Sequence, residues 1–379
     1  MKHNDIQEQA EGRSSYELGS CRVELAKPVL VKRSSSFLWF PSLVKLSNND
    51  VLAKMYIIPD MDLYSFMGSL TWSSDQGRTW SDEQGAVFYG PTGFNDSRGN
   101  HIMLPFELYR LSNMEGKGHG APHNVIPAGK REVRYRSRKA TVSGFPYPDE
   151  SKSPEIGLSG FSLDGQVIDS LEGGYLTTLF GTFVGQRRAC NVLAKSSNGL
   201  DWEVVSVIAP ADCGLPGKDG PTETALLRLK DGRLMCVFRL QSNHPFGQTW
   251  SQDEGRTWSE PNRMPEQLFS VEPRALVTAE GAILMVGGRP GIYLWVNKDG
   301  CGSSWETIDV RRHHNTVVPD EPIREPQQTT AYTDIIALGG NDYLYIYDRI
   351  PCGWNAIPDD SSLTNSVWVV RITVQQFCI

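Results

Sequence analysis

The chain has 379 residues, of which 36 are glycine and 23 proline, and 39% of its residues are hydrophobic. This composition suits a core-forming protein with many turns, and the formal net charge of -7 argues against nucleic acid as the main partner. No apolar run approaches the ~20 residues that cross a bilayer, so no membrane partner is expected.

Seven cysteines are scattered along the chain, an odd number, and none shows the spacing of a zinc site. We interpret them as buried thiols in a reducing compartment. The segment from Met1 to Tyr16 is polar and lacks the hydrophobic region of a signal peptide, so a cytoplasmic location is expected unless a leader was trimmed. No ligand cluster calls for a metal ion, and no cofactor is expected.

Residues 1–20 are predicted to be a flexible lead-in. Strands begin at Cys21, and the first clear hairpin joins Leu38–Leu46 to Val51–Ile58. Residues 83–169 break the rhythm of strands and are interpreted as an insertion or a set of long surface loops, with a substrate-contacting loop as the alternative. The later predicted strands are Leu176–Phe183, Thr224–Leu229, Leu234–Phe238, Ala282–Val286, Thr333–Ala337, Tyr343–Tyr347 and Ser366–Val374, the last pairing with the N-terminal strand.

Four turns of similar amino-acid sequence follow predicted strands, and each ends in tryptophan. They are Ser73–Trp80, Ser196–Trp202, Ser251–Trp258 and Asn297–Trp305. In each, an Asp or Asn can bond the local backbone, a glycine supplies a position with positive φ, and the indole packs under the hairpin. One such turn would be ordinary, but four indicate a repeated β-unit.

The turns resemble the Asp-box, Ser-x-Asp-x-Gly-x-Thr-Trp, of the sialidase superfamily. The resemblance implies an all-β protein, a six-bladed β-propeller of four-stranded antiparallel blades, formed as one domain by residues 21–379. Trp202, Trp258 and Trp305 follow one another at about the length of one blade, roughly 40–50 residues. The longer interval from Trp80 to Trp202 predicts one blade without such a turn, together with an insertion.

The same resemblance implies catalytic residues. Tyr332, in Ala331-Tyr332-Thr333-Asp334-Ile335, matches the family's nucleophile, and Glu223 matches the residue that activates it. A neutral phenol avoids the repulsion that a carboxylate nucleophile would meet from an acidic sugar, and sialidases are an exception to the two-carboxylate rule. The general acid is Asp60 or Asp62, which the sequence does not separate.

Arg239 and Arg289 match substrate-binding arginines of the family, with Arg274 as the fallback for Arg289. The chain departs from the pattern at Trp39, which stands where the family has an arginine that grips the substrate carboxylate. A guanidinium supplies paired charged hydrogen bonds, whereas an indole supplies a stacking face. A sugar other than sialic acid, stacked on Trp39, is therefore expected.

The function expected is that of a sialidase-like, retaining exo-glycoside hydrolase acting on a terminal sugar that is acidic or polyhydroxylated. One alternative is a non-catalytic carbohydrate-binding propeller. Another is a propeller glycosidase or lyase that uses a histidine, His119 or His123. The pair His313-His314, beside two arginines, is predicted to lie in a solvated loop.

Overall fold

The computed structural model describes residues 8–10, 12–60, 67–82, 87–88, 92–105, 109–111, 118–119, 121–144, 160–163, 165–183, 186–241, 244–358 and 363–376. Over these ranges the chain is all-β apart from one helix, α1 (Val310–Val317). Two compact units are present: residues 1–89 with 273–379, and residues 90–272. No helix in the described ranges is long and apolar enough to cross a membrane.

The first unit contains three sheets with antiparallel pairing. The first sheet is formed by β5 (Trp39–Lys45), β6 (Val51–Tyr56), β7 (Met67–Ser73), β8 (Ser81–Asp82) and β9 (Val87–Phe88). The second is formed by β25 (Arg274–Val277), β26 (Ile283–Gly288), β27 (Ile292–Asn297) and β28 (Glu306–Asp309). The third is formed by β1 (Glu8–Ala10), β2 (Arg13–Glu17), β3 (Cys21–Leu25), β4 (Val29–Ser34), β29 (Asp334–Gly339), β30 (Asp342–Arg349) and β31 (Asn365–Gln376).

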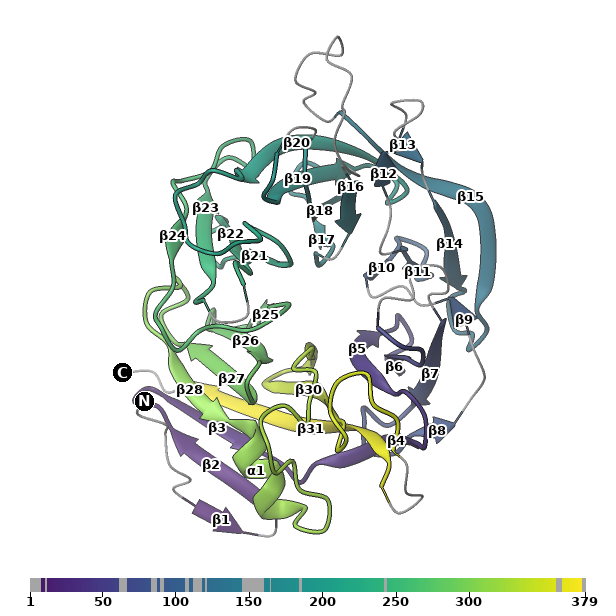
Figure 1. Ribbon diagram of the computed structural model, residues 1–379, viewed down its shortest axis with the longest axis vertical. Helices are drawn as coiled ribbons and strands as arrows, with labels where there is room; N and C mark the ends of the chain where they lie inside the picture. Colours follow the sequence, from purple (N-terminus) through teal and green to yellow (C-terminus); the bar gives the residue numbers. More distant parts are fainter. Residues whose placement is uncertain are drawn as a thin grey trace. The chain divides into compact units, whose positions relative to one another are not determined.

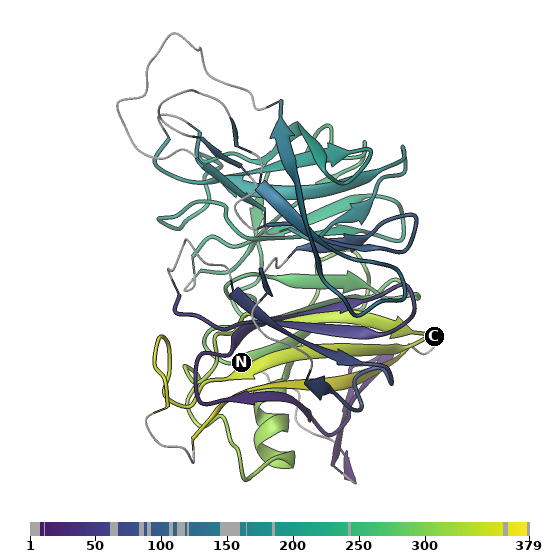
Figure 2. The same cartoon turned by 90° about the vertical axis from the view of Figure 1, so that its right-hand side faces the viewer.

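In the third sheet, strands from the two ends of the sequence pair with each other. On one side β31 pairs with β30, and on the other with β3 and then β4 (Figure 1). Figure 2 shows the purple N-terminal strands beside the yellow β31. This confirms the prediction that the C-terminal strand pairs with the N-terminal one.

The described part of the segment predicted as a flexible lead-in, residues 8–10 and 12–20, instead contains strands of this sheet. β2 pairs with β3, and Tyr16 and Leu18 are both 2% exposed. These two apolar side chains anchor a segment that is otherwise polar, and burying each contributes about 1.5–3 kcal/mol of transfer free energy. Because only these two residues indicate burial, the polar composition of the segment suggested a flexible lead-in.

The second unit contains two sheets. The larger is formed by β10 (Gly93–Asn95), β11 (His101–Met103), β12 (Tyr109–Leu111), β13 (Gly118–His119), β14 (Ala121–Ile126), β15 (Arg134–Ser143), β16 (Gly160–Leu163), β17 (Ile168–Asp169), β18 (Tyr175–Gly181), β19 (Cys190–Ser196) and β20 (Asp201–Ala209). The smaller is formed by β21 (Thr224–Arg228), β22 (Leu234–Phe238), β23 (Gly247–Ser251) and β24 (Asn262–Arg263).

Residues 83–169 therefore contribute regular structure as well as connections. The run β10-β11-β14-β15 is antiparallel and carries no Asp-box, as expected for the blade inferred between Trp80 and Trp202. A short parallel pairing between β15 and β20 joins this run to the run β18-β19-β20. Three of these strands, β10, β11 and β14, have only three to six residues, which explains why the sequence suggested loops.

The four tryptophan-terminated turns have the geometry that their sequence predicts. In the turn after β23, Asp253 accepts hydrogen bonds from the Thr257 backbone (2.9 Å) and hydroxyl (2.6 Å), and Gly255 has a φ of 86°. The Trp258 indole N–H then donates to the Gly255 carbonyl at 3.1 Å. This indole-to-glycine bond recurs in the turns that end at Trp202 and Trp305.

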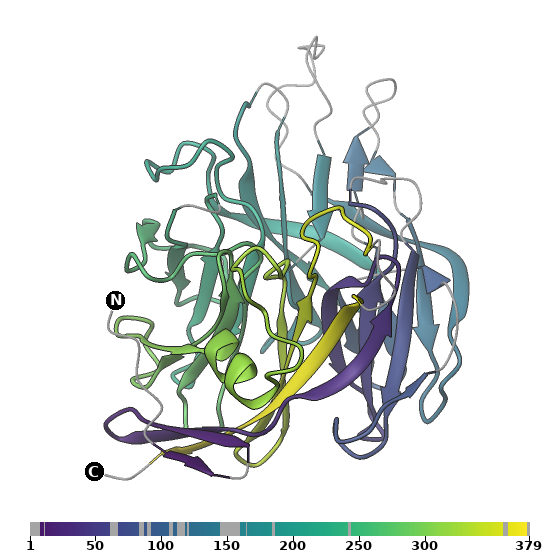
Figure 3. The same ribbon diagram turned by 60° about the horizontal axis from the view of Figure 1, so that its bottom comes forward.

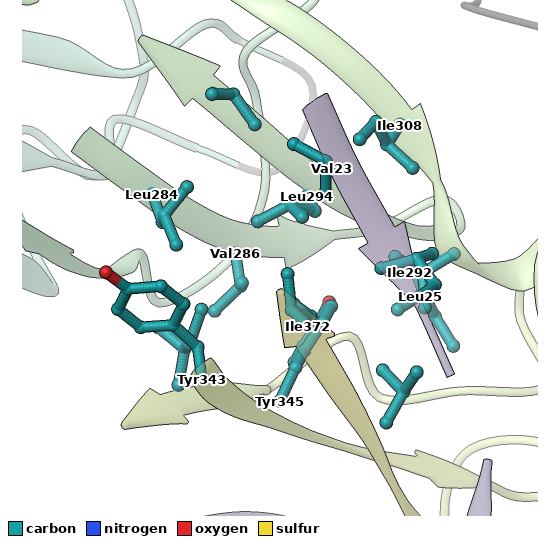
Figure 4. Packing of buried hydrophobic residues seen from close by; sticks show 14 of the residues in the cluster. Val23, Leu25, Leu284, Val286, Ile292, Leu294, Ile308, Tyr343, Tyr345 and Ile372 are labelled. Atoms are coloured by element: carbon teal, nitrogen blue, oxygen red, sulfur yellow. The ribbon is translucent and has the colours of Figure 1, made fainter. Parts of the chain in front are cut away.

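Apolar cores lie between the sheets within each unit. Figure 4 shows one from the first unit, where side chains of β3, β26, β27, β30 and β31 meet. Leu284, Leu294 and Tyr345 there are fully buried. Burying an aliphatic side chain of this size contributes about 1.5–3 kcal/mol, so the cluster fixes the positions of the strands around it.

Helix α1 corrects the prediction for His313 and His314, because both imidazoles are 0% exposed. His313 bonds the Ser14 hydroxyl (2.7 Å) and the Ala26 carbonyl (2.9 Å), and His314 bonds the Tyr347 hydroxyl at 2.9 Å. Figure 3 shows α1 lying near the yellow β31. The N-cap of the helix is Asp309, whose carboxylate accepts the Arg312 N–H, in a sequence that otherwise looks like a polar loop.

Candidate active site

Tyr332 lies in the connection that leads into β29. The residue before it, Ala331, has a φ of 61°, and the Thr330 hydroxyl accepts the Tyr332 backbone N–H at 3.3 Å. The phenol ring meets the ring of Phe40 edge-on, with centroids 4.9 Å apart. Tyr332 is half-buried, so its ring is held by neighbours while part of it remains accessible.

Arg289 approaches Tyr332 from the end of β26. Its guanidinium carbon lies 5.3 Å from the centroid of the Tyr332 ring and 4.5 Å from that of Trp354. One of its N–H groups donates to the Thr330 carbonyl at 2.9 Å. Gly288 lets the backbone turn here, because a Cβ at that position would come within 1.8 Å of the Gly291 carbonyl oxygen. The geometry thus fixes a cation over two aromatic rings.

Asp348, on β30, forms hydrogen bonds with both the connection before Tyr332 and the backbone of Phe40. Its side chain is fully buried and accepts hydrogen bonds from the Thr329 hydroxyl, from the Thr330 N–H and hydroxyl, and from the Phe40 N–H. Burial raises the pKa of Asp348, and these hydrogen bonds lower it by less. One carboxyl group therefore sets both the Tyr332 connection and the Phe40 backbone.

Trp354 supplies the exposed indole of the group, with 39% of its surface accessible. Trp39 is 1% exposed, and its N–H donates to the Ile58 carbonyl at 3.0 Å. Its ring stacks on Phe40 (4.9 Å) and lies 5.4 Å from Trp354. Trp39 therefore supports the neighbouring rings, which corrects the expectation that it offers a stacking face to sugar.

We call Phe40, Arg289, Tyr332 and Trp354 the Tyr332 cluster. Unusual backbone conformations gather in and beside it. Seven non-glycine residues in the described ranges have positive φ, and they are Phe40, Asn49, Gln76, Glu254, Arg289, Ala331 and Asn355. Three of these occupy turns between strands, whereas Phe40, Arg289, Ala331 and Asn355 belong to the cluster or adjoin it. Such conformations persist only where surrounding structure enforces them, and they concentrate at functional sites.

Of the two candidate acids, Asp60 is described and Asp62 lies outside the described residues. The Asp60 backbone N–H donates to the Asn355 side chain at 3.0 Å, next to Trp354 in the sequence. Asp60 is half-buried. A carboxyl group of the right kind thus lies in the loop that adjoins the Tyr332 cluster.

Arg274, the fallback for Arg289, is 5% exposed and interacts with Asp334. Burial raises the pKa of Asp334, while the charges of Arg274 and Lys54 lower it by less. Asp334 also accepts the Leu43 N–H at 2.8 Å. Arg274 is thus engaged in a buried charge group, and Arg289 is the stronger candidate for contact with substrate.

In the second unit, Glu223 and Arg239 form an ion pair of 2.6 Å across the start of the β21–β22 hairpin. The Arg239 N–H also donates to the Glu223 carbonyl at 2.9 Å. Their side chains are 12% and 18% exposed. The predicted spacing of one hairpin therefore brings these two residues together.

His123, predicted to bind substrate or to act as a base, is instead buried. His123, on β14, is 4% exposed and bonds the Arg138 carbonyl at 3.0 Å. Burial lowers its pKa, so it is a neutral packing residue. His119 lies in β13, which pairs with β12. Across the described ranges, no group of three or more His, Cys, Asp and Glu side chains could hold a metal ion.

Sequence reasoning missed Phe40, Trp354 and Asp348. Trp354 had a usable signal, since a large aromatic residue in the turn Cys352-Gly353-Trp354-Asn355 is unusual for a connection. Phe40 had no such signal, because the residue to which its backbone N–H donates, Asp348, is distant in the sequence.

No protein-family model matches the chain. A search of curated proteins likewise found no match. Similarity therefore rests on three-dimensional structure alone.

Solved structures with the same fold were found at low sequence identity. A protein of unknown function from Dyadobacter fermentans has a TM-score of 0.65 at 16% identity, over 93% of this chain and 99% of that one. The Hadza microbial sialidase Hz136 has a TM-score of 0.62 at 11% identity, over 93% and 68%. The GH93 α-L-arabinofuranosidase of Fusarium graminearum, solved with arabinobiose, has a TM-score of 0.58 at 13% identity, over 91% and 97%. The chain has the six-bladed β-propeller fold of sialidases and GH93 arabinofuranosidases.

Proposed function

We propose that this protein is a retaining, exo-acting glycoside hydrolase of the sialidase-like type, with Tyr332 as nucleophile. The observation that carries the proposal is the concentration of enforced backbone conformations around Tyr332, with the Arg289 guanidinium 5.3 Å from its ring. A site built only for folding stability has no need for four such conformations, each of which costs on the order of 1–3 kcal/mol. The likeness to a sialidase and an arabinofuranosidase supports sugar cleavage as the reaction.

The proposed reaction has two steps. In the first, the Tyr332 oxygen attacks the anomeric carbon and gives its proton to the Glu223 carboxylate. The glycosidic C–O bond breaks, and the leaving oxygen takes a proton from Asp60 or Asp62. In the second step, water attacks the same carbon and gives a proton to that aspartate. The tyrosinate leaves and recovers its proton from Glu223. The guanidinium of Arg289 favours the negative charge that develops on the phenol oxygen.

Hydrolysis of fluorogenic glycosides by wild type and Tyr332→Phe tests the proposal. The phenylalanine keeps the ring under Arg289 and removes only the attacking oxygen, so turnover should fall by at least about a thousandfold with little change in stability. Glu223→Gln should also reduce turnover strongly. Activity that survives Tyr332→Phe would refute the tyrosine mechanism.

One observation favours a second function, that of a non-catalytic carbohydrate-binding propeller. Glu223 accepts a hydrogen bond from Arg239 at 2.6 Å, an ion pair that can hold the hairpin without taking part in any catalytic step. If all glycosides in the panel remain intact while sugars bind, the binding function replaces the catalytic one.

A further inference from the structure

We propose that the sugar taken by the Tyr332 cluster is uncharged, and that Trp354 is the surface on which its apolar face packs. This inference rests on the proposed function for its location, but it concerns what the site recognises. It is carried by how the charges and aromatic faces of the first unit are arranged.

The guanidinium of Arg289 already contacts three groups of the protein. It donates to the Thr330 carbonyl at 2.9 Å and lies over the rings of Tyr332 and Trp354. A sugar carboxylate is bound well by a guanidinium group that offers two parallel N–H donors. Arg289 in this position suits single hydrogen bonds to hydroxyl groups better than a paired grip on a carboxylate.

Two other cations of the first unit lie buried beside a protein carboxyl group. Arg274 and Lys54 are 5% and 1% exposed and interact with Asp334. An acidic sugar would have to compete with Asp334 for these buried cations.

Aromatic surface takes the place of the missing arginine. Trp39 packs against Phe40 and Trp354 at 4.9 and 5.4 Å, and Phe40 meets Trp354 at 5.3 Å. These contacts hold the Trp354 ring, yet 39% of the residue remains exposed. A held, partly exposed indole is what a sugar ring with a C–H face needs, because little side-chain freedom is lost on binding.

Binding to the full-length wild type, measured by calorimetry with matched sugars, tests the inference. Methyl glucoside and methyl galactoside are compared with methyl glucuronide and methyl galacturonide, and methyl arabinofuranoside and methyl sialoside are added. A neutral sugar should bind more tightly than its charged counterpart by about fivefold or more, with an affinity unchanged between 50 and 500 mM salt, since screening acts only on charge.

Variants assign the role of Trp354. Trp354→Ala should weaken neutral-sugar binding by about tenfold or more, and Trp354→Phe should retain most of it because an aromatic face remains. Tyr135→Ala removes another exposed aromatic residue, 66% accessible on β15, and should leave binding unchanged. Thermal unfolding of each variant separates loss of binding from loss of folding.

The outcomes are distinguishable from those that test catalysis. Tighter binding of a uronide or the sialoside, no binding by any sugar, or full affinity in Trp354→Ala would overturn the inference. Hydrolysis of an acidic glycoside that disappears in Tyr332→Phe would overturn it while supporting the proposed reaction. Neutral sugars that bind through Trp354 but are never cleaved would support it and refute the hydrolase.

Discussion

Asp348 offers a sharp test of how the Tyr332 cluster is held. Its Oδ1 accepts from the Thr329 hydroxyl (2.8 Å) and the Thr330 N–H (2.8 Å), and its Oδ2 accepts from the Phe40 N–H (3.2 Å) and the Thr330 hydroxyl. In Asp348→Asn, the amide oxygen can keep the first two bonds. The amide nitrogen then faces the Phe40 N–H, so two donors meet, whereas the Thr330 hydroxyl can rotate to accept.

The expected loss follows from this count. One buried donor without an acceptor destabilises the fold by about 1–3 kcal/mol. Burial raises the pKa of Asp348, so removing the charge offsets part of that loss and leaves a net effect of about 1–2 kcal/mol. Asp348→Ala strands four donors and should lower the free energy of unfolding by about 4 kcal/mol or more.

In Asp348→Asn we also expect a large fall in kcat. A displacement of the Thr330 carbonyl and the Phe40 ring would move both Arg289 and Tyr332, and a shift of about 1 Å at a reacting group can lower kcat by about a hundredfold. Because Asp348 does not touch the sugar in this scheme, we expect kcat to fall by about 10–100-fold with KM changed less than threefold.

Urea unfolding followed by tryptophan fluorescence, and glycoside turnover on the same samples, provide the measurements. Asp342→Asn is the matched control, because Asp342 lies on the same strand, is 40% exposed and pairs with Arg371 at the surface. That variant should lose less than about 1 kcal/mol. An Asp348→Asn protein with wild-type midpoint and wild-type kcat would refute the reasoning.

Three further outcomes are expected. Burial lowers the pKa of His314 to about 3 from 6.5, so between these pH values the unfolded chain binds a proton that the folded chain does not. The free energy of unfolding should therefore fall as the pH drops from about 6.5 towards 3, by up to about 1.4 kcal/mol per pH unit. The urea midpoint of His314→Gln should depend less steeply on pH, and parallel profiles would contradict this. Trp39→Phe keeps an aromatic ring but loses the hydrogen bond to the Ile58 carbonyl, so its free energy of unfolding should drop by about 1–2 kcal/mol while its sugar affinity stays within twofold of wild type. A variant that loses sugar affinity but keeps full stability would show that Trp39 contacts the sugar after all. Hydrogen bonds from Thr257 lower the pKa of Asp253 to about 2, so Asp253→Ala should lower the melting temperature measurably at pH 7 and by less near pH 2, and equal losses at both pH values would exclude a role for the ionised carboxylate.

The repeated turns could be predicted from sequence because each is local. Asp253, Gly255 and Thr257 lie within five positions, so the hydrogen bonds that shape the turn depend only on neighbouring residues. The same holds for the ion pair of Glu223 and Arg239, which a single hairpin brings together. The pairing of β31 was also foreseeable, from its alternation and its position in the chain.

The Tyr332 cluster could be predicted only in part, because its geometry depends on contacts between distant residues. Phe40 adopts a positive φ beside a hydrogen bond to Asp348, 308 positions away. Trp39 appeared to be a substitution for an arginine, and sequence could not show that its ring is covered by neighbours. His314 looked polar, yet its partners come from β30 and from the loop after α1.

The pairing of β31 has a consequence for the growing chain on the ribosome. The partner of β4 in the described structure, residues 365–369, follows it in the chain by more than 300 positions. Until then its backbone N–H and C=O groups offer an open edge to any other nascent strand. A stop codon anywhere before residue 365 would make that exposure permanent, so we expect truncated products to be retained by chaperones or degraded. This sheet can therefore be completed only after residues 365–369 have been synthesised.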